Sequence, residues 1–529
     1  MSTAHDYDAI VIGGGHNGLV NGAYLAKAGL RTLILERRHL VGGAAITEEL
    51  MPGFHFTTFS YAVSLVRPQV VHELDLVRHG YMPLHMPTTY APMEDGDHLL
   101  LGQDHHENVH EIRRHSARDA DAYDQYSHDL AQVVQALKPL FDSVPPNLFS
   151  DDPDELANLV QVGRHLKGLP KRVLHNCVRL LTGSAADFLD HYFESEILKG
   201  LLASSSIIGS KVGPRSQGSG MVLLVHNMGE QDGVFGTWGF HKGGNGGFTQ
   251  VLARAAQAFG AEIRTDSPVA QVLMHGGRTT GVVLADGTEL SAPVVVSALD
   301  PRRTFLQLVD PAELPDDLVD AVTRYRFQGT SSKVNFALDG LPLPRGEGAS
   351  GDWLRGFINI GPSIDYLERA FDDAKYGWYS KHPYIDGCIQ SMIDPDMAPA
   401  GKHVMSCFVH YTPYELKGSD WETERQGLGD AVQATLERFF PGFGDLVLRR
   451  EVVTPLDIER VVGLSEGNIF AGELMSPQMY FFRPAPGWNQ YRTPISGYYQ
   501  CGSGTHPGGC VTGGPGRLAA QQILGDRRA

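Results

Sequence analysis

The chain has 529 residues, a length that suggests roughly two to four domains. Its 44 Lys and Arg against 61 Asp and Glu give a net charge of −17, which argues against a protein that binds nucleic acid. Apolar residues make up 42% of the chain, enough for a large core, and the five cysteines form no CxxC pair, which disfavours a zinc ribbon or a secreted disulfide framework.

The sequence shows neither a membrane span, nor a signal peptide, nor a metal-binding motif. No apolar run approaches the ~18–20 residues of a membrane span, and the first residues do not have the basic-then-apolar layout of a signal peptide. We therefore expect a cytoplasmic protein, and peripheral contact with a membrane stays open. The histidines between His105 and His115 match no metal-binding spacing, so we expect no metal site.

The first 36 residues have the pattern of a strand, a helix and a second strand. Residues 9–12 are apolar and predict a short buried strand, which ends in the glycine-rich segment 13–18. Small and apolar residues at helical spacing fill 19–28, and residues 32–36 predict the second strand. This layout is typical of a dinucleotide-binding βαβ unit.

The spacing Gly13-x-Gly15-x-x-Gly18 is the glycine fingerprint of such a unit. Gly13 permits the tight turn, Gly15 lets a pyrophosphate approach the backbone, and Gly18 permits close packing of the helix on the strand. Glu36 ends the second strand, where its carboxylate can accept hydrogen bonds from ribose hydroxyls. Because strand, helix, second strand and terminal acid are all present, we predict a dinucleotide site here.

The rest of the chain alternates helical stretches with glycine-rich ones. Residues 105–200 predict mostly helices, and the turns within residues 269–298 predict short hairpin strands. Glycines cluster again at Gly42-Gly43, over 209–247 and over 497–514. The last cluster reads as a strand, a loop and a helix N-terminus, which suits the pyrimidine end of a flavin better than it suits NAD. These segments predict one cofactor domain assembled from three separated pieces.

Four stretches of the chain carry a family resemblance. They are GGGHNGLVNGAYLAKAG, LERR with GGAAITEE, HKGGNGGFTQVLARAAQAFGAEI and GSGTHPGGCVTGGPG. Together they resemble the phytoene desaturase-related FAD oxidoreductases, and within them the subgroup of pyridine nucleotide-disulfide oxidoreductase domain-containing proteins and FAD-type β-carotene ketolases. The resemblance implies non-covalent FAD and an α/β fold. In that fold a split Rossmann-like FAD-binding domain (residues 1–66, 215–300 and 460–529) carries an inserted α+β substrate domain (residues 67–214 and 301–459).

The resemblance also assigns cofactor contacts to individual residues. The glycines of the fingerprint would hold the pyrophosphate, the acid at the end of the second strand would bind the adenosine ribose, and the glycine pair after it would line a second phosphate loop. A strand start in the middle of the chain would meet the adenine through its backbone, and five residues near the C-terminus would surround the isoalloxazine. In chain order these residues are Gly13, Gly15, Gly18, Glu36, Gly42, Gly43, Val269, Gly504, Thr505, His506, Gly513 and Gly514. No catalytic residue is assigned.

The function that the resemblance implies is an FAD-dependent oxidoreductase. Its substrate would be an extended apolar molecule, carotenoid- or isoprenoid-like, that is desaturated, isomerised or oxidised at the flavin. Two alternatives stay open: an FAD amine oxidase, which would need an aromatic cage beside the flavin, and a flavin-bearing regulatory protein with little turnover. The oligomeric state is not indicated by the sequence.

Two further residue patterns are interpreted as structural. Disulfide reductases need a reactive cysteine pair near the flavin, but Cys501 and Cys510 lie nine residues apart across a glycine loop, so we expect no redox pair. Lys333 lies on a predicted strand among small and apolar residues. We interpret it as a solvated strand lysine, with contact to the flavin as the alternative.

Overall fold

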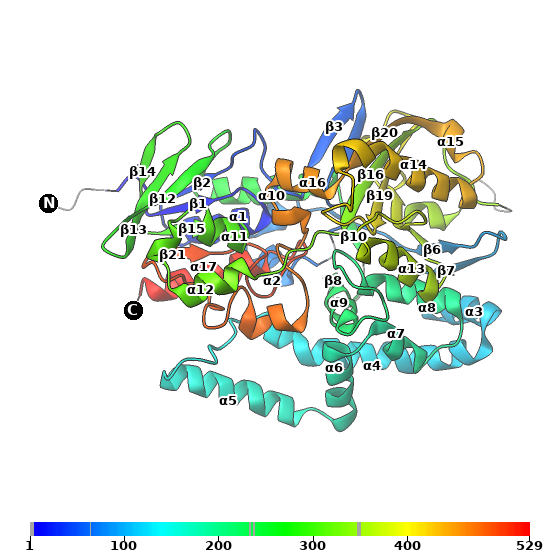
Figure 1. The fold of residues 1–529 in the computed structure, drawn as a ribbon, viewed down its shortest axis with the longest axis horizontal. Coiled ribbons are helices and arrows are strands. Elements are labelled where there is room, and N and C mark those ends of the chain that lie inside the picture. The colour runs from blue at the N-terminus through cyan, green and yellow to red at the C-terminus, as the bar shows by residue number, and fades with distance from the viewer. Residues whose placement is uncertain (1–4, 64, 232–233, 236–237, 346–350, 529) are drawn as a thin grey trace.

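The computed structural model describes residues 5–63, 65–231, 234–235, 238–345 and 351–528. Two β-sheets organise these residues, as Figure 1 shows. A five-stranded sheet lies on the side of the molecule where both ends of the chain are found, and a seven-stranded sheet lies on the opposite side. The chain passes between the two sheets several times.

The five-stranded sheet is parallel and draws its strands from distant parts of the chain. Every residue of its two N-terminal strands is buried, as expected for a parallel sheet that is covered on both faces. In spatial order the strands are β11 (Glu262–Arg264), β2 (Thr32–Leu35), β1 (Ala9–Ile12), β15 (Val295–Ser297) and β21 (Tyr498–Gln500).

Different layers cover the two faces of this sheet. On one face, apolar residues of the sheet pack against the helices α1 (His16–Lys27), α10 (Gly244–Ala258) and α17 (Gly514–Asp526). The other face packs against a three-stranded antiparallel sheet and two short helices. These elements are β12 (Val269–His275), β13 (Arg278–Leu284), β14 (Glu289–Ser291), α11 (Pro301–Leu306) and α12 (Asp316–Thr323).

The seven-stranded sheet is antiparallel except where β17 runs parallel to β6. In spatial order its strands are β20 (Val447–Val453), β16 (Ser331–Leu338), β19 (His403–His410), β18 (Tyr384–Ile389), β17 (Phe357–Ile360), β6 (Thr89–Pro92) and β7 (His98–Leu101). One face packs against α14 (Trp421–Phe439). The other face is turned toward a helical region and forms one core with it.

The helical region lies along the lower part of the view in Figure 1. Its helices are α3 (His105–His115), α4 (Ala117–Phe141), α5 (Pro153–Gly168), α6 (Lys171–Thr182), α7 (Ala185–Asp190), α8 (Glu196–Ala203) and α9 (Ser219–His226). The helix α5 differs from the others because none of its residues is buried. It exposes the apolar side chains of Leu156 and Val160, and Arg164 and Lys167 follow in the same helix.

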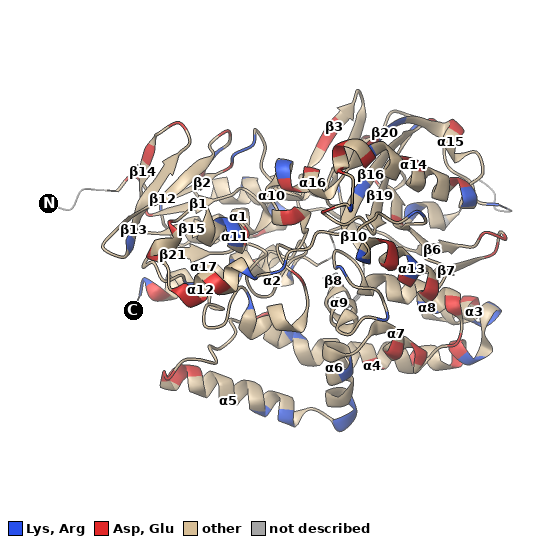
Figure 2. Ribbon diagram, in the orientation of Figure 1, with Lys and Arg blue, Asp and Glu red and all other residues tan. Residues whose placement is uncertain are grey.

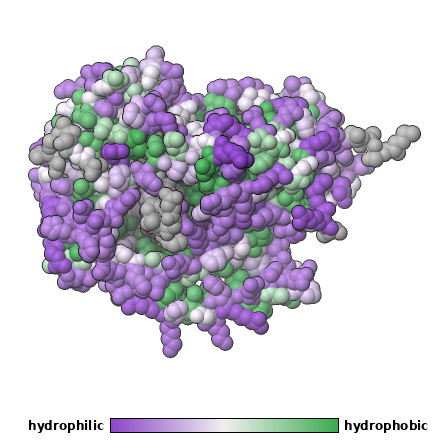
Figure 3. All heavy atoms as spheres, turned by 180° about the vertical axis from the view of Figure 1, so that it is seen from behind, coloured by the Kyte–Doolittle hydropathy of each residue, from purple (hydrophilic) through white to green (hydrophobic). Residues whose placement is uncertain are grey.

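Charge and hydropathy are mixed on the surface. In the view of Figure 2, acidic and basic residues are scattered over most elements, and no continuous basic face is seen. Seen from behind, hydrophobic residues show between hydrophilic ones, including at the lower edge (Figure 3). Within the described residues, no helix combines the length and the apolar character that crossing a membrane requires.

This architecture confirms the predicted α/β class. A Rossmann-like parallel sheet is split among the N-terminal, middle and C-terminal parts of the chain, and a mixed sheet with helices forms the second part. Residues 300–460, in which the sequence showed no local motif, supply five of the seven strands of the mixed sheet. The residue boundaries of the two predicted domains stay a prediction.

The packing of α1 on β1 gives a first testable prediction. A Cβ atom on Gly18 would lie 2.0 Å from the Gly13 carbonyl oxygen, so no side chain fits there. We expect Gly18→Ala to lower the free energy of unfolding by about 1–3 kcal/mol, because the helix must move away from the strand. Urea unfolding followed by circular dichroism measures the change.

The matched control is Gly163→Ala on α5, where a Cβ atom would meet nothing within 4 Å. Alanine is the better helix former by about 1 kcal/mol, so this variant should be unchanged or slightly more stable. Equal destabilisation by the two replacements would contradict the packing explanation.

Candidate cofactor and substrate sites

The start of α1 offers unpaired backbone donors to a ligand. Gly13 adopts a φ of +102°, which turns the chain from β1 toward the helix. Gly15 is the N-cap residue, its helix has no side-chain cap, and no acidic residue lies in the first turn. The backbone N–H groups of the first turn and the positive end of the helix are therefore available to a phosphate.

A second glycine loop lies directly against the first. The Gly42 N–H group donates a hydrogen bond to the Gly14 carbonyl oxygen at 2.8 Å. A Cβ atom on Gly15 would lie 3.9 Å from the Gly43 Cα atom, and one on Gly43 would lie 3.2 Å from the Gly15 Cα atom, so the two loops are in contact. A pyrophosphate bound at this junction would meet the backbone of both loops rather than side chains.

Buried polar atoms without partners at the start of α1 also fit a polar ligand. Among the described residues, His16 Nε2 and Asn17 Oδ1 have no hydrogen-bond partner. The Asn17 amide nitrogen is used, since it donates to Ser503 Oγ at 3.1 Å. Burial lowers the pKa of His16 to about 4, so its ring is neutral. A buried polar atom costs free energy unless a partner is supplied, and a bound cofactor would supply one.

Glu36 lies where the sequence predicts it, at the end of β2. It is only 7% exposed, and its carboxylate accepts hydrogen bonds from the N–H groups of Gly14 and Arg38, both at 2.9 Å. The start of β12 is next to it, because the Ser267 N–H group donates to the Glu36 carbonyl oxygen at 2.8 Å. Glu36 and Val269 thus belong to adjoining segments. Their contacts with ribose and adenine stay a prediction.

The C-terminal loop between β21 and α17 is tightly packed. A Cβ atom on Gly504 would lie 2.3 Å from Pro301, and one on Gly513 would lie 3.3 Å from Val20 and Val70. The Thr505 hydroxyl donates to the Gly502 carbonyl oxygen at 2.8 Å. These residues fix the loop against the sheet and α1.

His506 and Gly514 are also packed into this loop. The His506 ring is buried, its Nε2 atom lies 3.1 Å from the Leu140 carbonyl oxygen, and burial lowers its pKa to about 3. A Cβ atom on Gly514 would touch Pro507 at 3.2 Å. In this loop the residues that line a cavity are Cys510 and Val511. A contact of the predicted five residues with the isoalloxazine stays a prediction.

The inner cavity is the space where these segments meet. Its wall combines the start of α1, the second glycine loop, the C-terminal loop and several aromatic rings. The residues that define it here are His16, Ala44, Ala45, Phe59, Tyr61, Ile208, His226, Trp238, Phe408, Phe470, Cys510 and Val511. Most of these side chains are apolar or aromatic, and the cavity has a volume of about 110 Å³.

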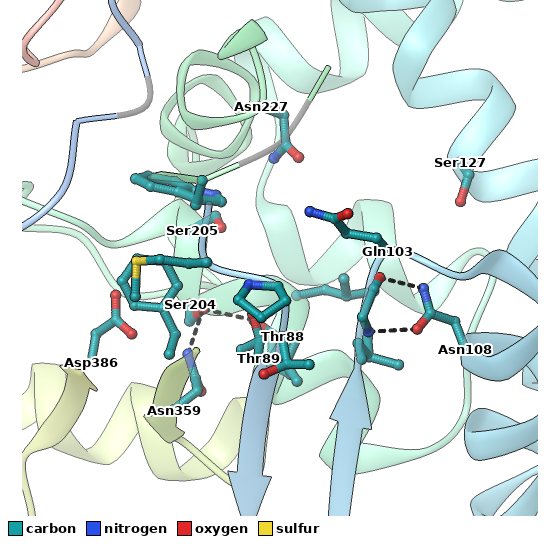
Figure 4. A pocket seen from close by; sticks show the side chains of 18 of the residues that line it. Thr88, Thr89, Gln103, Asn108, Ser127, Ser204, Ser205, Asn227, Asn359 and Asp386 are labelled. Atoms are coloured by element: carbon teal, nitrogen blue, oxygen red, sulfur yellow. Dashed lines mark hydrogen bonds between the residues drawn. The ribbon is translucent and has the colours of Figure 1, made fainter. Parts of the chain in front are cut away.

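The outer cavity adjoins the inner one and has a volume of about 670 Å³. Tyr61, Ile208 and Trp238 line both cavities. The outer cavity lies between one face of the seven-stranded sheet and the helical region. Its apolar lining includes Met86, Leu101, Leu130, Val134, Leu201 and Phe357. Its polar lining, seen in Figure 4, includes Thr88, Thr89, Gln103, Asn108, Ser127, Ser204, Ser205, Asn227, Asn359 and Asp386.

Asp386 and Asn359 are neighbours on the sheet face that lines the outer cavity. They are paired across β18 and β17, and both point toward the cavity in Figure 4. The Tyr61 hydroxyl donates a hydrogen bond to Asp386 Oδ2 at 2.6 Å. Burial raises the pKa of Asp386 to about 7, although the hydrogen bond from Tyr61 acts in the opposite direction. Near neutral pH this carboxyl group can both accept and donate hydrogen bonds.

Lys333 lies on the same sheet face, and its interpretation as a solvated lysine is wrong. It is 1% exposed, and its ammonium group donates to the Thr57 carbonyl oxygen at 3.1 Å and to the Ser406 hydroxyl. The same group lies 5.3 Å from the centre of the Tyr61 ring. Burial lowers the pKa of Lys333 to about 8.

The cysteines have no redox partner. All five are free, and burial raises the pKa of the Cys510 thiol to about 12 and raises the pKa of the Cys501 thiol as well. Neither is a thiolate at neutral pH, so neither has the reactivity of a redox cysteine. The described residues contain no group of histidines, cysteines and acids that could hold a metal ion.

Sequence reasoning did not find Tyr61, Asn359 or Asp386. The signal was present but weak: in the strand Tyr384–Ile389, polar and apolar residues alternate, which shows that one face of the strand is not ordinary core. Nothing local shows what that face contacts. The partner of Asp386 is a tyrosine that lies 325 positions earlier in the chain.

Comparison with known proteins identifies the class of protein to which this fold belongs, an FAD-dependent oxidoreductase. Residues 18–524 match the flavin containing amine oxidoreductase family. The chain is 40% identical, over 98% of its length, to pyridine nucleotide-disulfide oxidoreductase domain-containing protein 2 of Rattus norvegicus, and it covers 94% of that protein. It is 24% identical to phytoene desaturase (lycopene-forming) of a Paracoccus species, with 98% of this chain and 97% of that protein covered.

A solved structure of a putrescine oxidase double mutant has the same fold, with a TM-score of 0.60 at 15% identity over 99% of both chains. The chain belongs to the flavin containing amine oxidoreductase family, and its cofactor is FAD. The resemblance to phytoene desaturase-related oxidoreductases is thereby confirmed.

Glu36 gives a testable prediction for cofactor binding. Glu36→Ala removes a buried carboxylate that orders Gly14 and Arg38 and that would bind the ribose. We expect the dissociation constant for FAD to rise about 10- to 100-fold, because hydrogen bonds to a charged group are worth roughly 1.5–3 kcal/mol. Titration of the apoprotein with FAD, followed by flavin fluorescence, measures it.

The matched control is Glu289→Ala, which removes an exposed acid from β14 of the three-stranded sheet. It should leave the affinity for FAD unchanged. An unchanged affinity in Glu36→Ala would remove Glu36 from the site.

Proposed function

We propose that the protein desaturates, isomerises or oxidises an extended, mainly apolar substrate at an FAD whose isoalloxazine lies in the inner cavity. The pyrophosphate would lie between the two glycine loops, with Glu36 on the ribose and the start of β12 on the adenine. Bound FAD supplies the capacity to accept two electrons as a hydride from a substrate carbon. The residues of the chain then have to bring that carbon to within about 3–3.5 Å of the flavin.

The observation that carries this proposal is the outer cavity. Its volume of about 670 Å³ is within the ~300–1,000 Å³ usual for ligand sites, and it meets the inner cavity at Tyr61, Ile208 and Trp238. Apolar side chains from the helical region, such as Leu130 and Val134 of α4, form much of its wall. An apolar molecule held there would have one end beside the flavin. The phytoene desaturase among the relatives supports a substrate of this class.

A second candidate function is the oxidation of an amine. An amine oxidase would need aromatic rings beside the flavin, and the inner cavity contains such rings: Phe59, Tyr61, Trp238, Phe408 and Phe470. A substrate ammonium group could lie against their faces. The polar residues of the outer cavity do not distinguish an amine from other polar groups.

Peripheral contact with a membrane is part of the same proposal, because it would give access to an apolar substrate. The helix α5 is the surface element that suits it. Leu156 and Val160 are 47% and 51% exposed, and Arg164 and Lys167 lie on the same helix. A helix with exposed apolar residues can lie in the interface of a bilayer. Because the first turn of α5 is acidic and the chain carries a net charge of −17, the contact would be apolar.

A substrate panel separates the two functions. FAD-loaded protein is mixed anaerobically with isoprenoid polyenes, short alkylamines or short hydroxy acids, in detergent micelles and in liposomes, and bleaching of the flavin absorbance is recorded. We expect only the extended apolar compounds to bleach the flavin. Bleaching by short amines alone, with release of hydrogen peroxide in air, would replace the proposal by the amine oxidase.

A further inference from the structure

The wall of the outer cavity carries two hydrogen-bonding groups that the protein itself does not fully use. They are the side chains of Asn359 and Asp386, which face each other across β17 and β18. Side chains directly opposite on neighbouring strands have their Cβ atoms about 4.5–5.5 Å apart, so one small group can contact both. Figure 4 shows both side chains pointing toward the cavity from the same side.

Asn359 has an acceptor without a donor. Its amide nitrogen donates to Ser204 Oγ at 3.0 Å and to Tyr384 Oη at 2.9 Å, and these two contacts hold the side chain in place. Its Oδ1 atom, on a side chain that is 3% exposed, has no hydrogen-bond partner among the described residues. A buried carbonyl oxygen without a donor is unfavourable, and a ligand with an N–H or O–H group would satisfy it.

Asp386 beside it has no basic partner. Among the described residues it forms no salt bridge, and its hydrogen bond from Tyr61 occupies Oδ2. Its partly exposed area faces the cavity. A carboxyl group in such a place is stabilised by a donor, whether it is ionised or neutral.

We propose that Asn359 and Asp386 bind a single hydrogen-bond-donating head group, a hydroxyl or an amino group, on an otherwise apolar substrate. The inference rests on the proposed function, because it assigns the class of substrate for the same outer cavity. The proposal also implies an orientation of the substrate in the outer cavity. Tyr61 contacts Asp386 and lines both cavities, so the head group lies toward the flavin side and the apolar remainder extends along α4.

The test compares ligands that share one isoprenoid chain and differ only in the head group. Farnesol and farnesylamine carry a donor, farnesyl methyl ether carries an acceptor only, and farnesene carries neither. Equilibrium dialysis of each against FAD-loaded protein under nitrogen gives its dissociation constant. We expect both donors to bind about tenfold more tightly than the ether and farnesene, which is the size of one good hydrogen bond to a charged or buried group.

Three variants test which residues cause the preference for donor head groups. Asp386→Asn keeps the shape of the side chain, and Asn359→Ala removes the unpartnered oxygen. Each of these two variants should reduce the tenfold preference to about threefold or less. The control is Ser127→Ala, which removes a polar group from α4 on another wall of the outer cavity and should keep the full preference. Flavin content and circular dichroism confirm that each variant is folded. If one of the two site variants does not fold, the other still tests the proposal.

The outcomes separate this inference from the function on which it rests. Equal binding of farnesol, the ether and farnesene to the wild type would overturn the head-group site and leave the apolar-substrate proposal standing. A preference that survives in both site variants would also overturn it. If none of the four compounds binds and short polar compounds do, the proposed function fails as well. A preference for only one of the two donors would support the site and identify its ligand.

Discussion

Backbone segments approach each other at the carboxyl ends of the parallel strands more closely than any side chain would allow, and the rest of the structure depends on this approach. A Cβ atom on Gly18 would lie 2.0 Å from the Gly13 carbonyl oxygen, and one on Gly516 would lie 2.3 Å from that of Asn17. The two contacts hold α1 against β1 and α17 against α1. As a result, the N-termini of α1 and α17 and the two glycine loops lie close together. Backbone N–H groups at such a place can bind a dinucleotide.

The seven-stranded sheet connects this cofactor site with the substrate side. One face of the sheet carries Lys333, Phe408, Asp386 and Asn359 on four different strands. Tyr61 lies on that face: its ring stacks on Phe408, and its hydroxyl group binds Asp386. A single side chain from the N-terminal part of the chain thus binds Asp386, lies near the Lys333 ammonium group and lines both cavities. A substitution in the wall of one cavity that moves Tyr61 is therefore expected to change ligand binding in the other cavity.

The sequence predicted what is encoded locally. The turn at Gly13, the acid at Glu36 and the glycine pair at 42–43 belong to one short segment, and each has a backbone or charge requirement that its neighbours reveal. Asn359 and Asp386 could not be predicted in the same way, because 27 positions separate them and only the sheet register brings them together. His506 shows what a local motif leaves undetermined. The motif predicts a contact with the flavin, and the fold adds that its ring packs against the end of α4.

The central claim is that the inner cavity holds the isoalloxazine and the outer cavity holds the substrate. It is tested most directly by the ratio of bound FAD to protein in two matched variants, each filling one cavity with a phenylalanine. Ala44→Phe fills the inner cavity and Ala131→Phe the outer one. The account predicts that folded Ala44→Phe protein is purified without FAD, while Ala131→Phe retains the wild-type ratio. A full complement of FAD in folded Ala44→Phe protein would contradict it.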